Sequence, residues 1–216
     1  MAGYMQLASA DITCTLKKAP EISIVASDTQ VNYDHTKSQA QMDSFDTDTV
    51  SPYARNVQTH VGGLMSGEVS ISQNLRMMQE TFPAFNAGCL FVDKITVNIH
   101  VAPTVYIARE YPKQGCMYAA IMEHEKKHIA VDREIVNKYT RIVGEAIDKV
   151  LKEIGYAHGP YPAQKIPAEQ QKIHAILQVL LKQYSDAMSA ERQKRQQAVD
   201  TLQEYERVQA LCRGKP

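Results

Sequence analysis

The sequence predicts an α+β protein in which a small antiparallel sheet packs on a long helix and is followed by a long antiparallel helical hairpin. Three observations lead to this fold class. Polar and apolar residues alternate over residues 94–101, which is typical of a half-buried strand. A helical pattern then runs from Met117 to Ile154, interrupted only by Gly144. A second apolar seam with helical spacing runs from Ile173 to Cys212.

Length and charge narrow the function classes. The chain has 216 residues and 44% hydrophobic content, which is enough for one substantial core. Its 24 basic and 24 acidic residues cancel, and no stretch concentrates Lys and Arg among aromatic residues, so we do not expect nucleic acid as a partner. No segment approaches the roughly 18 continuous apolar residues that a membrane span needs, so no span is expected.

The cellular compartment stays open between two interpretations. The first ten residues lack the basic region and the apolar region of an intact secretory signal. We therefore expect either a cytoplasmic protein or a mature domain whose signal has been removed. The four cysteines have no C-x-x-C spacing. They fit structural disulfides in an oxidising compartment, with free buried thiols as the alternative.

The first strands are predicted in the N-terminal third of the chain. A moderate alternating pattern predicts a strand from residue 10 to about residue 26. A hairpin is expected from residues 53–61 and 69–71, with the glycine-rich segment 62–67 as its connection. This segment lacks the Gly-Lys-Ser/Thr ending of a phosphate-binding loop, so we interpret it as a turn.

A clearer hairpin precedes the long helix. Residues 90–101 form its first strand, Ala102 and Pro103 make the turn, and residues 104–109 return as the partner strand. The helix is then expected to start near Cys116. The predicted order is therefore a β-hairpin followed directly by the long helix.

The two predicted helices are each about 40 residues long and are joined by a tight loop over residues 156–162, so they should fold back as an antiparallel pair. Counting outward from the loop brings Cys212 level with Cys116. We therefore predict a Cys116–Cys212 disulfide and leave Cys14 and Cys89 to tie the sheet. The distal part of the hairpin should project and offer a surface for a protein partner or for self-association.

The helix carries His124, Glu125 and His128, which form an H-E-x-x-H motif. Four-residue spacing places the two imidazoles one turn apart on the same face, about 5–6 Å between Cβ atoms, so both can reach one ion. The apolar seam of the helix includes both histidines, so both should point inward. Each could instead be a core histidine bonded to a carbonyl, but two stacked inward rings beside an acid favour a metal site.

These three residues resemble the zincin class of metallopeptidases. The resemblance implies zinc as cofactor, His124 and His128 as ligands, and Glu125 as the general base that activates a zinc-bound water. The stretch 89–128 also resembles, loosely, an uncharacterised bacterial family described as secreted zinc-dependent proteases. That likeness implies a periplasmic or secreted bacterial protein, with a cytoplasmic location as the alternative.

The third metal ligand is not marked by the sequence. No glycine and third histidine follow at the metzincin spacing, and Glu145 should ride the same helix about 25 Å away. Asp132, one turn beyond His128, is our candidate ligand. It could also orient the His128 ring, or be a solvated helix acid. A distant histidine remains open as an alternative: His35, His60 or His158.

We therefore predict a zinc-dependent metallopeptidase-like hydrolase that uses a metal-activated water on a peptide or protein substrate. Residues 1–134 would form the zincin-like catalytic core, and residues 135–216 a helical hairpin that packs back on it. The main alternative is a non-enzymatic periplasmic interaction or scaffold protein with a structural metal site. A metal-storage or metal-sensing protein is a third option.

Overall fold

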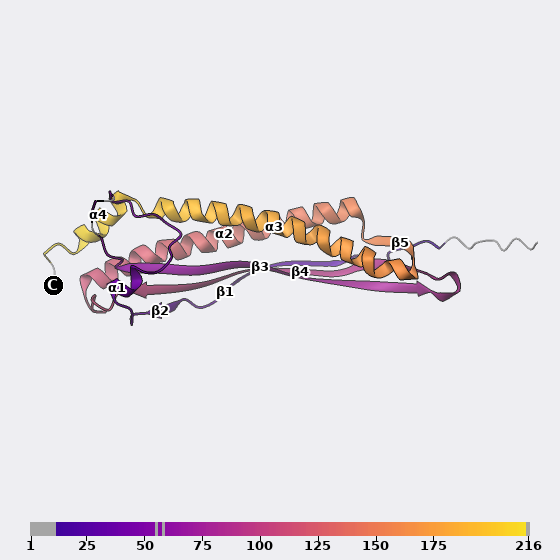
Figure 1. Cartoon of the computed structure of the whole chain (residues 1–216), viewed down its shortest axis with the longest axis horizontal. Coiled ribbons are helices and arrows are strands. Elements are labelled where there is room, and N and C mark those ends of the chain that lie inside the picture. The colour runs from indigo at the N-terminus through magenta and orange to yellow at the C-terminus, as the bar shows by residue number, and fades with distance from the viewer. Residues whose placement is uncertain (1–11, 55, 58, 215–216) are drawn as a thin grey trace, which may run out of the picture. The chain divides into compact units, whose positions relative to one another are not determined.

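A computed structural model describes residues 12–54, 56–57 and 59–214. It divides the chain into two compact units that interleave along the sequence. Among the described residues, unit 1 comprises residues 12–23, 73–96 and 145–180, and unit 2 comprises those within 24–72, 97–144 and 181–214. The predicted domain boundary at residue 134 falls inside a helix and stays a prediction. The elements, labelled in Figure 1, are β1 (Glu21–Asp28), β2 (Asn32–Asp34), α1 (Gln39–Met42), β3 (Gly63–Phe82), β4 (Ala87–Ile107), α2 (Cys116–Ile154), β5 (Ala157–Pro162), α3 (Ile166–Val199) and α4 (Leu202–Leu211).

The sheet is built on β4, with which β1, β2, β3 and β5 all pair. β2 pairs in parallel, with Asn32 opposite Thr104, whereas β5 pairs antiparallel, with Ala87 opposite Pro162. The prediction of a small antiparallel sheet is therefore wrong. The sequence reasoning paired only strands joined by a local turn, and a parallel partner has to come from a distant part of the chain.

The predicted turn at Ala102 and Pro103 is also wrong, because β4 continues through it to Ile107. The Thr29 N–H donates to the Val101 carbonyl, and the β2 register begins at Thr104. Pro103 thus lies opposite the residues that separate β1 from β2. A proline is tolerated within a strand where no ladder hydrogen bond is required of it.

The glycine-rich segment is not a hairpin connection, because β3 runs without interruption from Gly63. A Cβ atom on Gly63 would lie 2.2 Å from Ile121 Cγ2 and 2.6 Å from Glu125 Oε1. A Cβ atom on Gly67 would lie 2.6 Å from Asp132 Oδ2. These glycines therefore let the strand pass close to side chains of α2.

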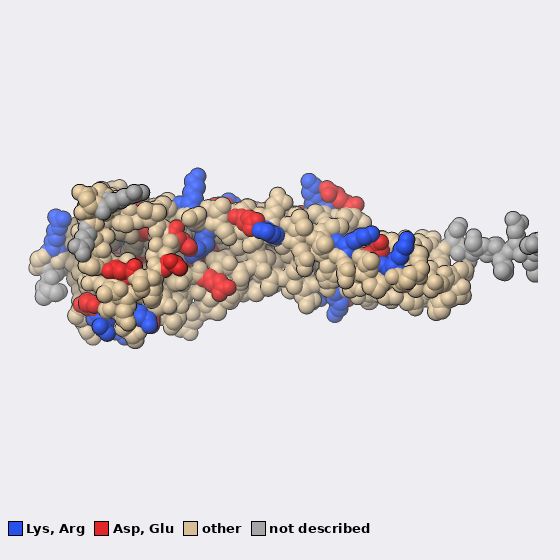
Figure 2. Space-filling view, viewed as in Figure 1, with Lys and Arg blue, Asp and Glu red and all other residues tan. Residues whose placement is uncertain are grey.

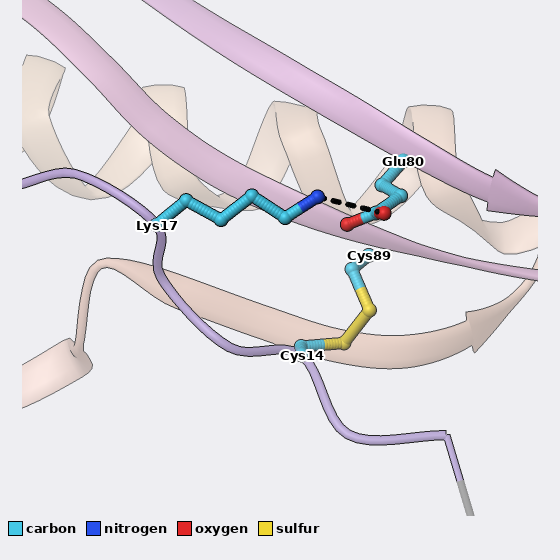
Figure 3. The surroundings of a disulfide bond; sticks show 4 residues. All are labelled: Cys14, Lys17, Glu80 and Cys89. Atoms are coloured by element: carbon cyan, nitrogen blue, oxygen red, sulfur yellow. Dashed lines mark hydrogen bonds and ion pairs between the residues drawn. A yellow bond between two sulfur atoms is a disulfide. The ribbon is translucent and has the colours of Figure 1, made fainter.

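Unit 1 contains the Cys14–Cys89 disulfide, as predicted. Lys17 Nζ donates to Glu80 Oε1 at 3.0 Å beside it (Figure 3). The interior of this unit is apolar, and its buried side chains come from β4, α2 and α3. They include Cys89, Leu90, Val92, Ile95, Ile147, Leu151, Ile166, Ile173 and Leu177.

Unit 2 contains the second predicted disulfide, Cys116–Cys212, which joins the first residue of α2 to the C-cap of α4. Contacts from His128 to Gln196 and from Asp132 to Arg192 show that α2 and α3 run antiparallel here. Both helices cover one face of the sheet in this unit (Figure 1). A cluster of apolar side chains holds α2 to β3, β4 and α4: Met65, Val105, Ile107, Ala120, Ile121, Ile129 and Val208.

Helix α2 begins at Cys116 and ends at Ile154, as predicted. The second predicted helix does not continue to Cys212. It breaks after Val199, and α4 starts at Leu202. This break brings a new side chain to the two motif histidines.

Candidate metal centre

Three buried side chains converge in unit 2: His124 and His128 from α2, and Asp200 from the junction between α3 and α4. Asp200 leaves the helix because Thr201 becomes the N-cap of α4, with its hydroxyl accepting from the Glu204 N–H at 3.2 Å. A threonine followed three residues later by glutamate is a common helix start. The chain therefore turns at the residue that completes the group.

The three facing atoms form a nearly regular triangle. Asp200 Oδ1 lies 3.1 Å from His124 Nε2 and 3.1 Å from His128 Nε2, and the two nitrogens are 3.3 Å apart. Ligands held about 2.0–2.1 Å from a tetrahedral zinc ion are themselves about 3.3 Å apart. The spacing in this group therefore fits three corners of a tetrahedral metal site.

The outer nitrogen of each histidine faces an acceptor. His128 Nδ1 lies 2.6 Å from Gln196 Oε1, and His124 Nδ1 lies 3.3 Å from Glu204 Oε1. An Nδ1–H that donates outward leaves the lone pair on Nε2. In that tautomer two lone pairs and a carboxylate oxygen point at one another, and a metal ion would satisfy all three, whereas a further proton on one ring would satisfy only some of them.

The electrostatics of the group also favour a cation. Burial would raise the pKa of Asp200, but the facing imidazoles of His124 and His128 hold it well below its usual range. Burial works against the charged form of His128, yet Asp200 and Glu125 raise its pKa overall. The carboxylate is therefore ionised, and it favours positive charge at the facing nitrogens, either as a bound metal ion or as a protonated imidazole.

Glu125 is buried beside the group, with only 3% of its surface exposed. Burial raises its pKa from 4.5 to about 7, although the imidazoles of His128 and His124 oppose the rise. The backbone N–H of Met65, on β3, also contacts this carboxylate. A carboxyl group with a pKa near neutrality can both accept and release a proton at physiological pH.

Asp132, the candidate third ligand, is fully buried but lies outside the group formed with Asp200. Arg192 Nε donates to Asp132 Oδ1 at 2.7 Å, and Gln196 Nε2 donates to the same oxygen at 2.6 Å. Since Gln196 also contacts the His128 ring, Asp132 reaches the histidine through one intervening side chain.

A cavity of about 620 Å³ opens onto His124, Glu125, His128 and Asp200. It is also lined by the start of β3, by the segment between α1 and β3, and by α4. Figure 2 shows a hollow in this face of unit 2 with acidic side chains gathered around it. The group is therefore accessible from one side, which a reactive site requires and a closed structural site does not.

Tyr205 also lines this cavity, and its ring meets the His124 ring edge-on with centroids 5.5 Å apart. Burial and the nearby carboxylates of Asp200 and Glu125 raise the pKa of its phenol. The hydroxyl therefore keeps its proton at neutral pH and can serve as a hydrogen-bond donor in the cavity.

The other histidines considered from the sequence have different surroundings. His35 Nε2 faces the Tyr111 carbonyl at 2.8 Å, and His60 Nδ1 donates to Asp43 Oδ2 at 2.7 Å. His158 and Glu145 belong to unit 1. Within the part of the chain that the structure describes, none of these joins the group of His124, His128 and Asp200.

Asp200, Gln196, Glu204 and Tyr205 are not among the site residues that the sequence predicts. A signal for the first was present, because the run Thr201-Leu202-Gln203-Glu204 matches a helix-capping box. The helix start at Thr201 is hidden in the sequence because Ala198, Leu202 and Tyr205 continue an apolar helical spacing across the break. The signal for Gln196 was weaker, namely the polar stretch that thins the seam of α3.

Comparisons with known proteins do not assign the chain to a family. No family model, curated protein or solved structure matches the chain. None of the described helices is long and apolar enough to cross a membrane. The two disulfides indicate an oxidising environment such as the extracellular one.

Proposed function

We propose that this chain is a zinc-dependent hydrolase of the metallopeptidase class, with His124, His128 and Asp200 as metal ligands and Glu125 as the general base. The observation that carries the proposal is the triangle of acceptor atoms with sides of 3.1–3.3 Å. Both histidines are tied at Nδ1, so that their Nε2 atoms point inward. Asp200, and not Asp132 as the sequence suggests, is the third metal ligand in this proposal.

Zinc is the metal that this donor set suits best. Two imidazoles and one carboxylate are a common catalytic zinc set, and three protein ligands leave a fourth position open to water or substrate. A zinc ion in such a site lowers the pKa of water toward neutrality and polarises a carbonyl group. The cavity gives that fourth position access from outside the protein.

Glu125 supplies the proton chemistry in this proposal. It directly follows His124, lines the same cavity and contacts the Met65 N–H, which fixes where its carboxylate points. From there it takes a proton from attacking water and returns it to the leaving amine. Tyr205 lines the same cavity and hydrogen-bonds Asp200, and we take its hydroxyl as the candidate donor to the developing oxyanion.

A peptide is the substrate class that the cavity supports. The first residues of β3 line it, so a strand edge lies beside Glu125. An extended peptide can add to such an edge through main-chain hydrogen bonds. Since both disulfides fit an oxidising compartment, we infer that the protein works in the periplasm or after secretion, on a peptide or protein partner.

A non-enzymatic scaffold with a structural metal is the second candidate, and one observation favours it. His124, His128 and Asp200 are each no more than 7% exposed, which is typical of a metal that holds helices together. In that case the ion would fasten α2 to the junction of α3 and α4, and Glu125 would have no chemical role.

The first test is the zinc content of protein purified without chelator or nickel affinity. We expect close to one equivalent, lost in the H124A/H128A variant, together with cleavage of members of a peptide library. E125Q should keep the zinc and lose the cleavage. Zinc that is retained with no cleavage by the unaltered protein would favour the scaffold, and absence of zinc from the unaltered protein would refute both.

A further inference from the structure

The buried side chain of Gln196 bridges Asp132 and the ring of His128, one of the proposed metal ligands. Its Oε1 faces His128 Nδ1 at 2.6 Å. Its Nε2 donates to Asp132 Oδ1 at 2.6 Å and to the His128 carbonyl at 3.2 Å. Its side chain is 2% exposed, so water does not compete for these contacts.

The amide can adopt this orientation only. A carboxylate and a carbonyl accept hydrogen bonds but do not donate them, so the nitrogen of Gln196 has to face Asp132 and the His128 carbonyl. The oxygen is then left facing the ring. Arg192 holds Asp132 in place with two hydrogen bonds, 2.7 Å to Oδ1 and 3.2 Å to Oδ2.

An oxygen that faces the ring accepts from Nδ1–H and cannot donate to a bare Nδ1. The neutral His128 ring therefore carries its proton on Nδ1 and its lone pair on Nε2. Without this acceptor, the nearest one for the ring would be Asp200 Oδ1, 3.1 Å from Nε2. The proton would then occupy the atom that a metal ion has to bind.

We propose that Gln196, fixed in one orientation by Asp132 and Arg192, is a positioning residue that keeps the His128 proton on Nδ1 and so holds Nε2 ready for the metal. Asp132 thereby orients the His128 ring through the Gln196 amide, without contacting the proposed metal itself. This inference rests on the proposed metal centre, but it concerns the metal-free protein and needs no hydrolysis. Loss of such an outer contact typically lowers metal affinity about 10- to 100-fold.

The test uses the full chain with nitrogen-15-labelled histidine rings. The protonated nitrogen of His128 is identified by NMR in the metal-free protein at alkaline pH, and zinc affinity is measured by competition with a chromophoric chelator. The unaltered protein should show Nδ1–H. In Q196M, which keeps the side-chain length without an acceptor, the proton should move to Nε2 and zinc should bind about 10- to 100-fold more weakly.

Two further variants separate positioning from packing. Q196E keeps an acceptor oxygen facing the ring in a side chain of nearly the same volume, so it should retain Nδ1–H where Q196M does not. Q197M changes the next residue, which bonds the Val50 backbone instead, and should change neither reading. An Nε2–H ring in the unaltered protein would overturn the inference, as would a Q196M variant with unchanged tautomer and affinity. If the unaltered protein binds no zinc, the proposed function fails, while the ring proton still reports on Gln196.

Discussion

Units 1 and 2 each hold one disulfide and parts of the same long strands and helices, but they bury different kinds of side chain. In unit 1 the buried residues that the structure describes are apolar. In unit 2 the interior also contains seven buried polar or charged residues: Ser38, His124, Glu125, His128, Asp132, Gln196 and Asp200. Buried charges destabilise a fold unless they are paired, so unit 2 carries a cost that unit 1 does not.

The comparison also shows how the cost of these groups is reduced. Each buried polar side chain around the centre has a partner that fits its chemistry, from Arg192 on Asp132 to Gln196 on His128. The exception is the inward triangle, where two ring nitrogens and a carboxylate oxygen converge on one point. A bound cation would relieve that arrangement, whereas the unpaired buried atoms described in unit 1, Gln73 Oε1 and His158 Nε2, are single polar atoms and not a group of possible metal ligands.

The largest expected effect comes from removing the third ligand. D200A should lower zinc affinity by more than the roughly 100-fold that an outer contact contributes, and should abolish any rise in melting temperature on adding zinc. D148A, which changes an exposed acid of unit 1, is the control and should bind zinc normally. Calorimetric titration measures both, and normal zinc binding by D200A would remove Asp200 from the centre.

The disulfides allow a matched comparison of the two units. Their loops span 75 and 96 residues, so the chain-entropy model assigns each about 4.5 kcal/mol of unfolding free energy. C14A/C89A and C116A/C212A should therefore be destabilised to a similar extent in urea. Only C116A/C212A should also weaken zinc binding, because Cys116 and Cys212 join the helices that carry His124 and Glu204. Equal zinc affinity in the two variants would show that the Cys116–Cys212 disulfide does not support zinc binding.

Glu125 should give the metal-free protein an unusual pH dependence. Its pKa is raised from 4.5 to about 7 on folding, so the native state binds more protons than the unfolded state between these values. Stability should fall as pH rises from about 4.5 to 7, by about 3 kcal/mol, and E125Q should remove this slope. Denaturant midpoints over this pH range report it, with the exposed Glu153 changed to Gln as control. Parallel curves for E125Q and the unaltered protein would contradict the prediction.

Two glycines give the smallest effects. A Cβ on Gly63 meets Ile121 and Glu125, and a Cβ on Gly88, in unit 1, comes within 2.8 Å of the Glu80 carbonyl oxygen. G63A and G88A should each cost about 1–3 kcal/mol through overpacking. Only G63A should impair peptide cleavage, because it displaces Glu125. Thermal unfolding and the peptide assay together distinguish the two, and equal loss of cleavage in G88A would argue against a local effect.

The sequence allowed the local features of the molecule to be predicted. The bounds of α2 follow from a helical pattern that only Gly144 interrupts between Gly115 and Gly155, and the disulfide from Cys116 to Cys212 follows from counting along two helices. His124 and His128 were found because both lie within five residues of one helix, where spacing alone sets their geometry.

The features that were mispredicted depend on distant partners. β2 pairs with a part of β4 that lies some 70 residues further along the chain. Pro103 is tolerated because β1 and β2 leave a gap opposite it. The glycines of β3 are required because side chains of α2 lie close to the strand. Asp200 lies 72 residues beyond His128, and no periodicity links them. The capping box at Thr201 would have revealed the break in the helix, though not what the break faces.

The position of Asp200 in the chain also orders events during synthesis. A growing chain carries both histidines long before it carries the third ligand, and the Cys116–Cys212 bond has to wait for a later residue still. A nascent or exported polypeptide therefore has no complete centre until residue 200 has been made and the helices have folded back. The proposed hydrolase would therefore stay inactive until the last of its three ligands has been added and folded into place.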